Sequence, residues 1–129
     1  VTANNFNRGA HVLLGNGDGS FQTATNYAIG DCGAVITGDF NNDGYTDFAV
    51  TNSVEAKITI MLGNGTGTFP NKLDCPVARG PVMLAVADFD RDGWRDLATV
   101  NQTANNVTVL LGKLLTFPRN APLWRLTAE

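Results

Sequence analysis

Residues 39–47 read DFNNDGYTD, and residues 88–96 read DFDRDGWRD. Each segment places an oxygen-bearing side chain at its first, third, fifth and ninth positions, and a glycine at its sixth. Calcium binds about six to eight oxygen atoms, and the alternate residues of a tight loop supply them together with one backbone carbonyl at the seventh position. The spacing therefore predicts two calcium loops.

The two loops belong to a longer repeat, because the second begins 49 residues after the first. Outside the loops, Val12-Leu13-Leu14-Gly15 recurs as Ile60-Met61-Leu62-Gly63 and again as Val109-Leu110-Leu111-Gly112. A fixed period of this size indicates a repeat architecture. One unit is thus written nearly three times in the chain.

Each unit has the pattern of four short strands separated by turn residues. The first strand is apolar and leads directly into the acidic loop, and the second leaves that loop. The third alternates apolar and polar residues, which is typical of a half-buried strand, and a Gly-rich turn then leads to a more polar fourth strand. No segment keeps the apolar spacing of a helix. The first three strands are predicted at residues 34–37, 47–50 and 57–62 in one unit and at 82–87, 96–99 and 106–111 in the next.

Four antiparallel strands at a period in the forties are typical of a β-propeller blade. The predicted fold is all-β, with about two and a half blades in this chain. We expect the outer half of a first blade at residues 1–30, a complete blade with its calcium loop at 31–79, and a third blade with its calcium loop at 80–129. The last strand of the third blade has diverged to Pro122-Leu123-Trp124-Arg125-Leu126.

An open arc of blades leaves unpaired strand edges, which a protein in water has to cover. Two arrangements do so: the chain is a fragment of a longer propeller whose remaining blades cover the edges, or further copies of the chain associate to complete a ring. The phase of the repeat at the two chain ends favours the fragment.

The sequence also allows predictions about phenylalanine and cysteine residues outside the loops. Phe21, Phe69 and Phe117 share one position of the repeat, and we expect them to pack between blades. Cys32 and Cys75 fall at non-equivalent positions, so a disulfide and two small buried thiols both remain open.

Composition narrows the function classes. Seven of the twelve acidic residues lie in the two loops and the basic residues are scattered singly, so no nucleic-acid partner is expected. The longest apolar stretches are far too short to span a bilayer, so membrane insertion is not expected. The one histidine, His11, has no nucleophile in a recognisable context, and we predict that the chain is not an enzyme. Weak oxygen-only calcium sites fill where calcium is millimolar, which predicts an extracellular or cell-surface location.

The acidic loop, the strand after it (Phe48-Ala49-Val50) and the Gly-rich turn together resemble the FG-GAP/VCBS repeat family. This family forms the calcium-binding blades of integrin α-subunit propellers and of many extracellular bacterial and fungal proteins. The resemblance implies one structural calcium ion in each loop and a role in adhesion or in recognition of a glycan or protein. The implied ligands are Asp39, Asn41, Asp43, the Tyr45 carbonyl and Asp47 in one site, and Asp88, Asp90, Asp92, the Trp94 carbonyl and Asp96 in the other.

Several alternatives remain open at this point. An EF-hand needs a helix on each side of the loop and a glutamate at the twelfth position, where this chain has Val50 or Thr99. A metal-free turn capped by Asp and Asn side chains needs no ion, although its carboxylates repel one another. For the function, the alternatives are a structural or self-assembling repeat piece and a non-catalytic part of a propeller-based polysaccharide lyase.

Overall fold

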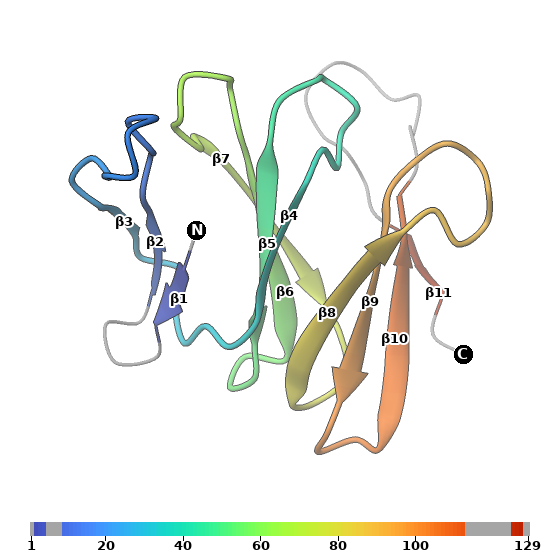
Figure 1. The fold of residues 1–129 in the computed structure, drawn as a ribbon. Coiled ribbons are helices and arrows are strands. Elements are labelled where there is room, and N and C mark those ends of the chain that lie inside the picture. Colours follow the sequence, from blue (N-terminus) through green and yellow to red (C-terminus); the bar gives the residue numbers. More distant parts are fainter. Residues whose placement is uncertain (1, 5–8, 113–124, 128–129) are drawn as a thin grey trace.

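The computed structural model describes residues 2–4, 9–112 and 125–127, which form three antiparallel sheets set side by side (Figure 1). Every strand pairs with its neighbours in sequence, so each sheet is a simple meander. The first sheet contains β1 (Thr2–Asn4), β2 (Gly9–Val12) and β3 (Thr25–Tyr27). The middle sheet contains β4 (Val35–Gly38), β5 (Asp47–Asn52), β6 (Lys57–Leu62) and β7 (Asn71–Pro76). The third contains β8 (Pro81–Ala87), β9 (Asp96–Asn101), β10 (Asn106–Leu111) and β11 (Arg125–Thr127).

The three sheets confirm the predicted all-β fold, and the middle and third sheets are the predicted four-stranded, blade-like units. The third strands match their predicted ranges, and the second strands extend two residues further than predicted, to Asn52 and Asn101. Within the described ranges there is no helix, and so none that could cross a membrane. Of the diverged last strand, residues 122–124 lie outside the described residues.

Two hydrophobic clusters join the three sheets. The first lies between the first and middle sheets, where Phe69 packs edge-on against Tyr27 and Phe48 with ring centroids 5.7 and 4.8 Å apart. The Phe69 N–H also donates to the Tyr27 hydroxyl at 3.1 Å. Phe69 is therefore a packing residue between sheets, as predicted.

The same prediction is wrong for Phe21, which is 65% exposed. Phe69 is covered by Tyr27, which belongs to the preceding sheet, whereas no described sheet precedes the first one to cover Phe21. Phe117 lies outside the described residues.

The two cysteines are free and buried, which decides between the two alternatives left by the sequence. Cys32 belongs to the first cluster and Cys75 to the second, which lies between the middle and third sheets. The middle sheet therefore separates the two thiols. Burial raises the pKa of both, that of Cys75 to about 11, so both act as small apolar side chains.

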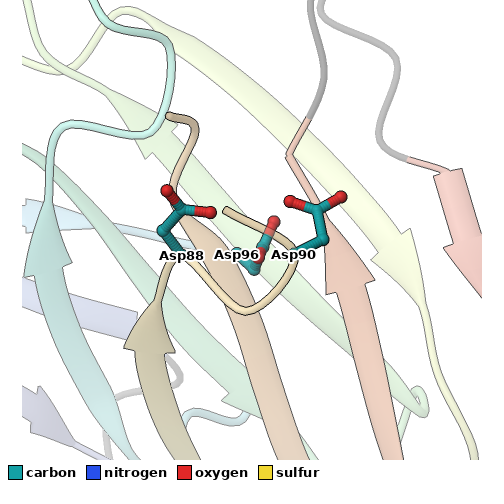
Figure 2. A group of neighbouring side chains, drawn as sticks. All are labelled: Asp88, Asp90 and Asp96. Carbon is teal, nitrogen blue, oxygen red and sulfur yellow. The ribbon is translucent and has the colours of Figure 1, made fainter. Parts of the chain in front are cut away.

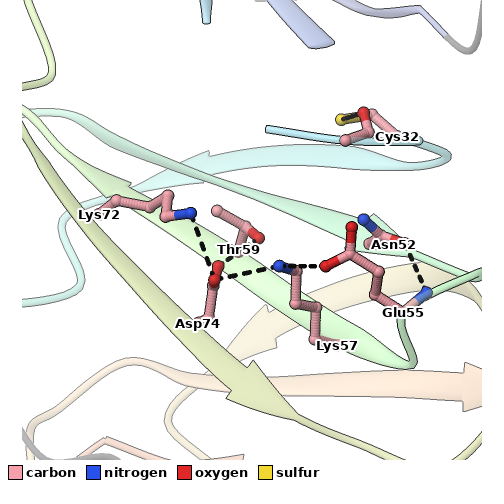
Figure 3. Close-up of polar contacts among 8 residues, drawn as sticks. Cys32, Asn52, Glu55, Lys57, Thr59, Lys72 and Asp74 are labelled. Atoms are coloured by element: carbon pink, nitrogen blue, oxygen red, sulfur yellow. Dashed lines mark hydrogen bonds and ion pairs between the residues drawn. The ribbon is translucent and has the colours of Figure 1, made fainter. Parts of the chain in front are cut away.

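A charged network ties β6 to β7 on the middle sheet (Figure 3). The Asp74 carboxylate contacts the Lys57 and Lys72 ammonium groups at 3.0 and 3.3 Å and accepts a hydrogen bond from the Thr59 hydroxyl at 2.7 Å. Lys57 also pairs with Glu55 in the turn between β5 and β6. Partly exposed ion pairs contribute little to stability, so this network adds only modestly to the pairing of β6 with β7.

Candidate functional site

The two acidic loops lie at equivalent places, one between β4 and β5 and the other between β8 and β9. Because strands flank both loops, the EF-hand alternative is wrong. Each loop turns through two residues with positive φ, at its fourth and sixth positions. These are Asn42 (+54°) and Gly44 (+85°) in the first loop and Arg91 (+61°) and Gly93 (+89°) in the second. The two segments therefore share one backbone conformation.

The aspartate at the first position organises the turn through its carboxylate. In the first loop, Asp39 Oδ1 accepts the Asp43 N–H at 3.2 Å and Oδ2 accepts the Gly44 N–H at 2.9 Å. The second loop repeats both bonds, from Asp92 N–H to Asp88 Oδ1 at 3.1 Å and from Gly93 N–H to Asp88 Oδ2 at 3.0 Å. The same two hydrogen bonds form in both loops, so the repeated sequence folds into the same turn geometry in each.

The aspartate at the ninth position is buried and joins two distant parts of its sheet. Asp47 accepts the Phe40 N–H on one oxygen and the Gly63 N–H on the other, both at 2.8 Å. Gly63 directly follows β6, so the carboxylate connects the start of the loop to the end of the third strand. Asp96 does the same with Phe89 at 2.6 Å and with Gly112 at 2.8 Å.

This second role of Asp47 and Asp96 was missed in the sequence, although a signal for it exists. A Leu-Gly pair marks the end of the third strand in the middle and third sheets, and in both its glycine follows the ninth-position aspartate by 16 residues. Gly63 also has a steric reason to be glycine. A Cβ atom at this position would lie 2.2 Å from the carbonyl oxygen of Thr46.

The second loop brings three carboxylates together. Oxygen atoms of Asp88, Asp90 and Asp96 all lie within 4.8 Å of one another, and Figure 2 shows the three side chains grouped at the loop. Two oxygens that bind one calcium ion at about 2.4 Å can lie no more than about 4.8 Å apart, so this group is compact enough to share an ion. In the described part of the chain it is the one acidic group of this kind. The first loop has an amide, Asn41, where the second has Asp90.

The residues at the fifth and seventh positions are also connected to each other. Asp43 Oδ1 accepts the Tyr45 N–H at 2.8 Å, and Asp92 Oδ1 accepts the Trp94 N–H at 2.9 Å. The Tyr45 side chain is exposed and lies against Gly65 in the Gly-rich turn between β6 and β7 (residues 63–67), and the Trp94 side chain is half-buried. The side chain of Asn41 bonds to Asp43, its amide nitrogen donating to Asp43 Oδ2 at 2.8 Å.

Negative charge is crowded in both loops. Burial raises the pKa of Asp47, and the carboxylates of Asp43 and Asp39 raise it further. Desolvation raises the pKa of Asp90, and the neighbouring Asp92 carboxylate adds to this effect. A bound cation would relieve this repulsion, because it favours the ionised form of every carboxylate around it.

The donor set fits calcium, since every side chain predicted to bind is a carboxylate or an amide that offers oxygen. The N–H bonds leave room for an ion, because an ionised carboxylate has about four acceptor sites and these bonds use two at most. The same hydrogen bonds would also hold a metal-free turn. A metal titration, and not the hydrogen-bond pattern, therefore distinguishes a calcium loop from a metal-free turn.

The two loops touch each other across neighbouring sheets. The Asn42 side-chain amide donates to the Gly93 carbonyl at 3.4 Å. This weak contact places the two candidate sites at the same end of the middle and third sheets.

A comparison with protein families identifies the repeat. The chain matches the family model described as FG-GAP-like repeat over residues 1–50 and again over residues 39–99. Among curated proteins and among solved structures, neither comparison finds a significant match. The two matched ranges together contain both acidic loops and cover well over half of the chain. The chain therefore belongs to the FG-GAP-like repeat family and is a β-propeller repeat module.

Proposed function

We propose that each acidic loop binds one structural calcium ion, and that the module serves an extracellular protein in adhesion or in recognition of a glycan or protein. The observation that carries the metal part is the compact group formed by Asp88, Asp90 and Asp96. The same backbone conformation and the same carboxylate bonds in the first loop extend the proposal to a second ion there. Two ions would bring a net positive charge of about four to a chain whose formal charge is −3.

A bound calcium ion would connect each acidic loop to the strands of its own sheet. Asp47 and Asp96 each connect a loop to the end of the third strand of the same sheet. An ion bound to either aspartate would fix the loop, both flanking strands and the following turn in one arrangement. Its binding free energy would add directly to the free energy of unfolding, because the ligands come together only in the folded chain.

The same chemistry supports the proposed extracellular location and the proposal that the module is not an enzyme. Oxygen-only sites of moderate affinity fill at the millimolar calcium concentration found outside cells. A calcium ion held by a full set of protein oxygens offers no open position to activate water, which metal-assisted hydrolysis requires. We therefore place the module among binding proteins and not among enzymes.

The recognition part is supported by exposed aromatic residues at the loops. Tyr45 and Phe89 are both about half exposed, at 48% and 49%, and both belong to the acidic loops. Exposed aromatic rings offer an apolar face against which the ring of a sugar or an apolar side chain of a protein can stack.

A glycan array probed with the labelled chain tests this function. We expect binding in calcium buffer, loss of binding after chelation, and a roughly three- to tenfold weaker signal for Tyr45→Ala, because one stacking contact is worth about 0.5–1.5 kcal/mol. Val54→Ala removes another exposed side chain, in the β5–β6 turn, and serves as the control. An array without bound glycan in calcium would reject the glycan ligand.

A further inference from the structure

The sequence contains three copies of the Asn-x-Thr pattern to which N-linked glycans are attached: Asn64-Gly65-Thr66, Asn101-Gln102-Thr103 and Asn106-Val107-Thr108. A glycan is bulky and polar, so a folded protein carries one on an asparagine at its surface. All three copies lie within the described residues, and their surroundings differ. The fold can therefore distinguish a usable acceptor from a chance match.

The two copies in the third sheet are held by each other. Asn101 ends β9 and is 0% exposed, and its amide hydrogen-bonds to the Asn106 side chain at 3.0 Å and to the Thr108 hydroxyl at 2.7 Å. Asn106 begins β10 opposite Asn101, and Thr108, the hydroxyl residue of its pattern, is 2% exposed. A glycan on either asparagine would break the bond between them, so neither suits the folded sheet.

Asn64 lies instead in the Gly-rich turn between β6 and β7, and its side chain and that of Thr66 are both exposed. Its oxygen, Oδ1, accepts the Thr66 N–H at 3.1 Å and the Thr66 hydroxyl at 2.7 Å. The Thr68 hydroxyl donates to the same atom at 3.1 Å. A backbone N–H can only donate, so these bonds identify which atom of the amide is the oxygen. The turn thus holds the Asn64 amide by its oxygen and leaves its nitrogen, Nδ2, available.

We propose that Asn64 is the N-glycosylation acceptor of this chain. The proposal rests on the extracellular role proposed above, because this modification belongs to secreted proteins. In the reaction, Nδ2 forms a bond to the anomeric carbon of the first sugar of a lipid pyrophosphate-linked oligosaccharide. The bond from that carbon to the pyrophosphate oxygen breaks, the pyrophosphate leaves with the electron pair, and Nδ2 releases one proton.

The first sheet provides a matched turn that lacks the acceptor pattern. Residues 15–19 repeat the Gly-rich turn, and Asn16 is exposed in the same place as Asn64. Two residues later the chain has Asp18, whose carboxylate accepts the Ser20 N–H at 2.9 Å and the Ser20 hydroxyl at 2.6 Å. The hydroxyl residue that the pattern requires is therefore absent, and Asp18→Thr would supply it.

Secretion of the chain from eukaryotic cells behind a cleavable signal peptide, followed by mass spectrometry of intact glycopeptides, tests the proposal. We expect a glycan on Asn64 in most of the secreted chains, and none on Asn101 or Asn106. Thr66→Ala should lose the glycan and Thr66→Ser should keep it. Thr66 is exposed, so both replacements leave the fold intact. Asp18→Thr should add a second glycan, on Asn16.

An unmodified Asn64 in the secreted parent chain overturns the proposal, and so does a glycan on Asn101 or Asn106 at equal occupancy. The experiment supplies the signal peptide, so a missing glycan rejects the acceptor without bearing on calcium binding. Melting the same secreted protein with calcium and with EDTA tests the metal part of the proposed function separately. A Tm that calcium leaves unchanged would reject that part and leave the Asn64 result standing.

Discussion

A Gly63→Ala variant is expected to lose about 3 kcal/mol or more of its free energy of unfolding, or to fail to fold. The new Cβ would lie 2.2 Å from the Thr46 carbonyl oxygen and 3.2 Å from its carbonyl carbon. Both atoms are backbone, so no side-chain rotation relieves the contact. A shift of Gly63 would also strain its bond to the buried Asp47 carboxylate. Urea unfolding of both proteins, followed by circular dichroism, measures the difference.

Gly15→Ala is the matched control, because Gly15 holds the same position of the repeat in the first sheet. Among the described residues, a Cβ there would meet no atom within 4 Å. We expect a change of less than about 1 kcal/mol, as is usual for alanine at an unstrained site. Equal urea midpoints for Gly63→Ala and Gly15→Ala would contradict the role assigned to Gly63.

An Asp96→Ala variant is expected to lose about 2–4 kcal/mol even when calcium has been removed by EDTA. The replacement leaves the Phe89 and Gly112 N–H groups without their acceptor, and each such loss in a buried site costs about 1–3 kcal/mol. Asp92→Ala removes another candidate ligand, but its side chain is exposed and accepts the Trp94 N–H at the surface. In EDTA it should therefore cost less than about 1 kcal/mol.

Chemical denaturation of both variants in EDTA and in calcium separates the two roles. Both variants should lose the stabilisation that we propose calcium gives to the second loop, but only Asp96→Ala should also be less stable than the parent chain in EDTA. If Asp96→Ala and Asp92→Ala were equally stable in EDTA, the buried carboxylate would not have the structural role that its bonds indicate.

Much of the fold could be predicted from the sequence, because the repeat reports the same structure more than once. The alternation in residues 57–62 and 106–111 located two third strands with correct ends, since a half-buried strand imposes a period of two. The glycines at the sixth loop position, Gly44 and Gly93, marked the turns, and both have positive φ.

The errors and omissions concern contacts between parts that are far apart in sequence. Phe21 and Phe69 have the same place in the repeat, but only Phe69 has Tyr27 of a preceding sheet to pack against. The bond from Asp47 to Gly63 depends on how closely the loop approaches the end of β6, which spacing alone does not reveal. Whether Cys32 and Cys75 could form a disulfide depended on which side of the middle sheet each thiol lies, and they lie on opposite sides.

We propose that calcium stabilises each acidic loop and the sheet around it, and thermal melting in EDTA and in calcium tests this proposal. At a calcium concentration of about 100 times the dissociation constant, each site adds about 2.7 kcal/mol. For a domain of this size that corresponds to a rise of roughly 10 °C in Tm for each site. Equimolar magnesium is the control, because it prefers a smaller octahedral site and retains its water molecules.

We predict a large rise in Tm with calcium for the parent chain, about half of that rise for Asp92→Ala, and little change with magnesium. A parent chain that melts at the same temperature in calcium and in EDTA would contradict the proposal, and the acidic loops would then be metal-free turns.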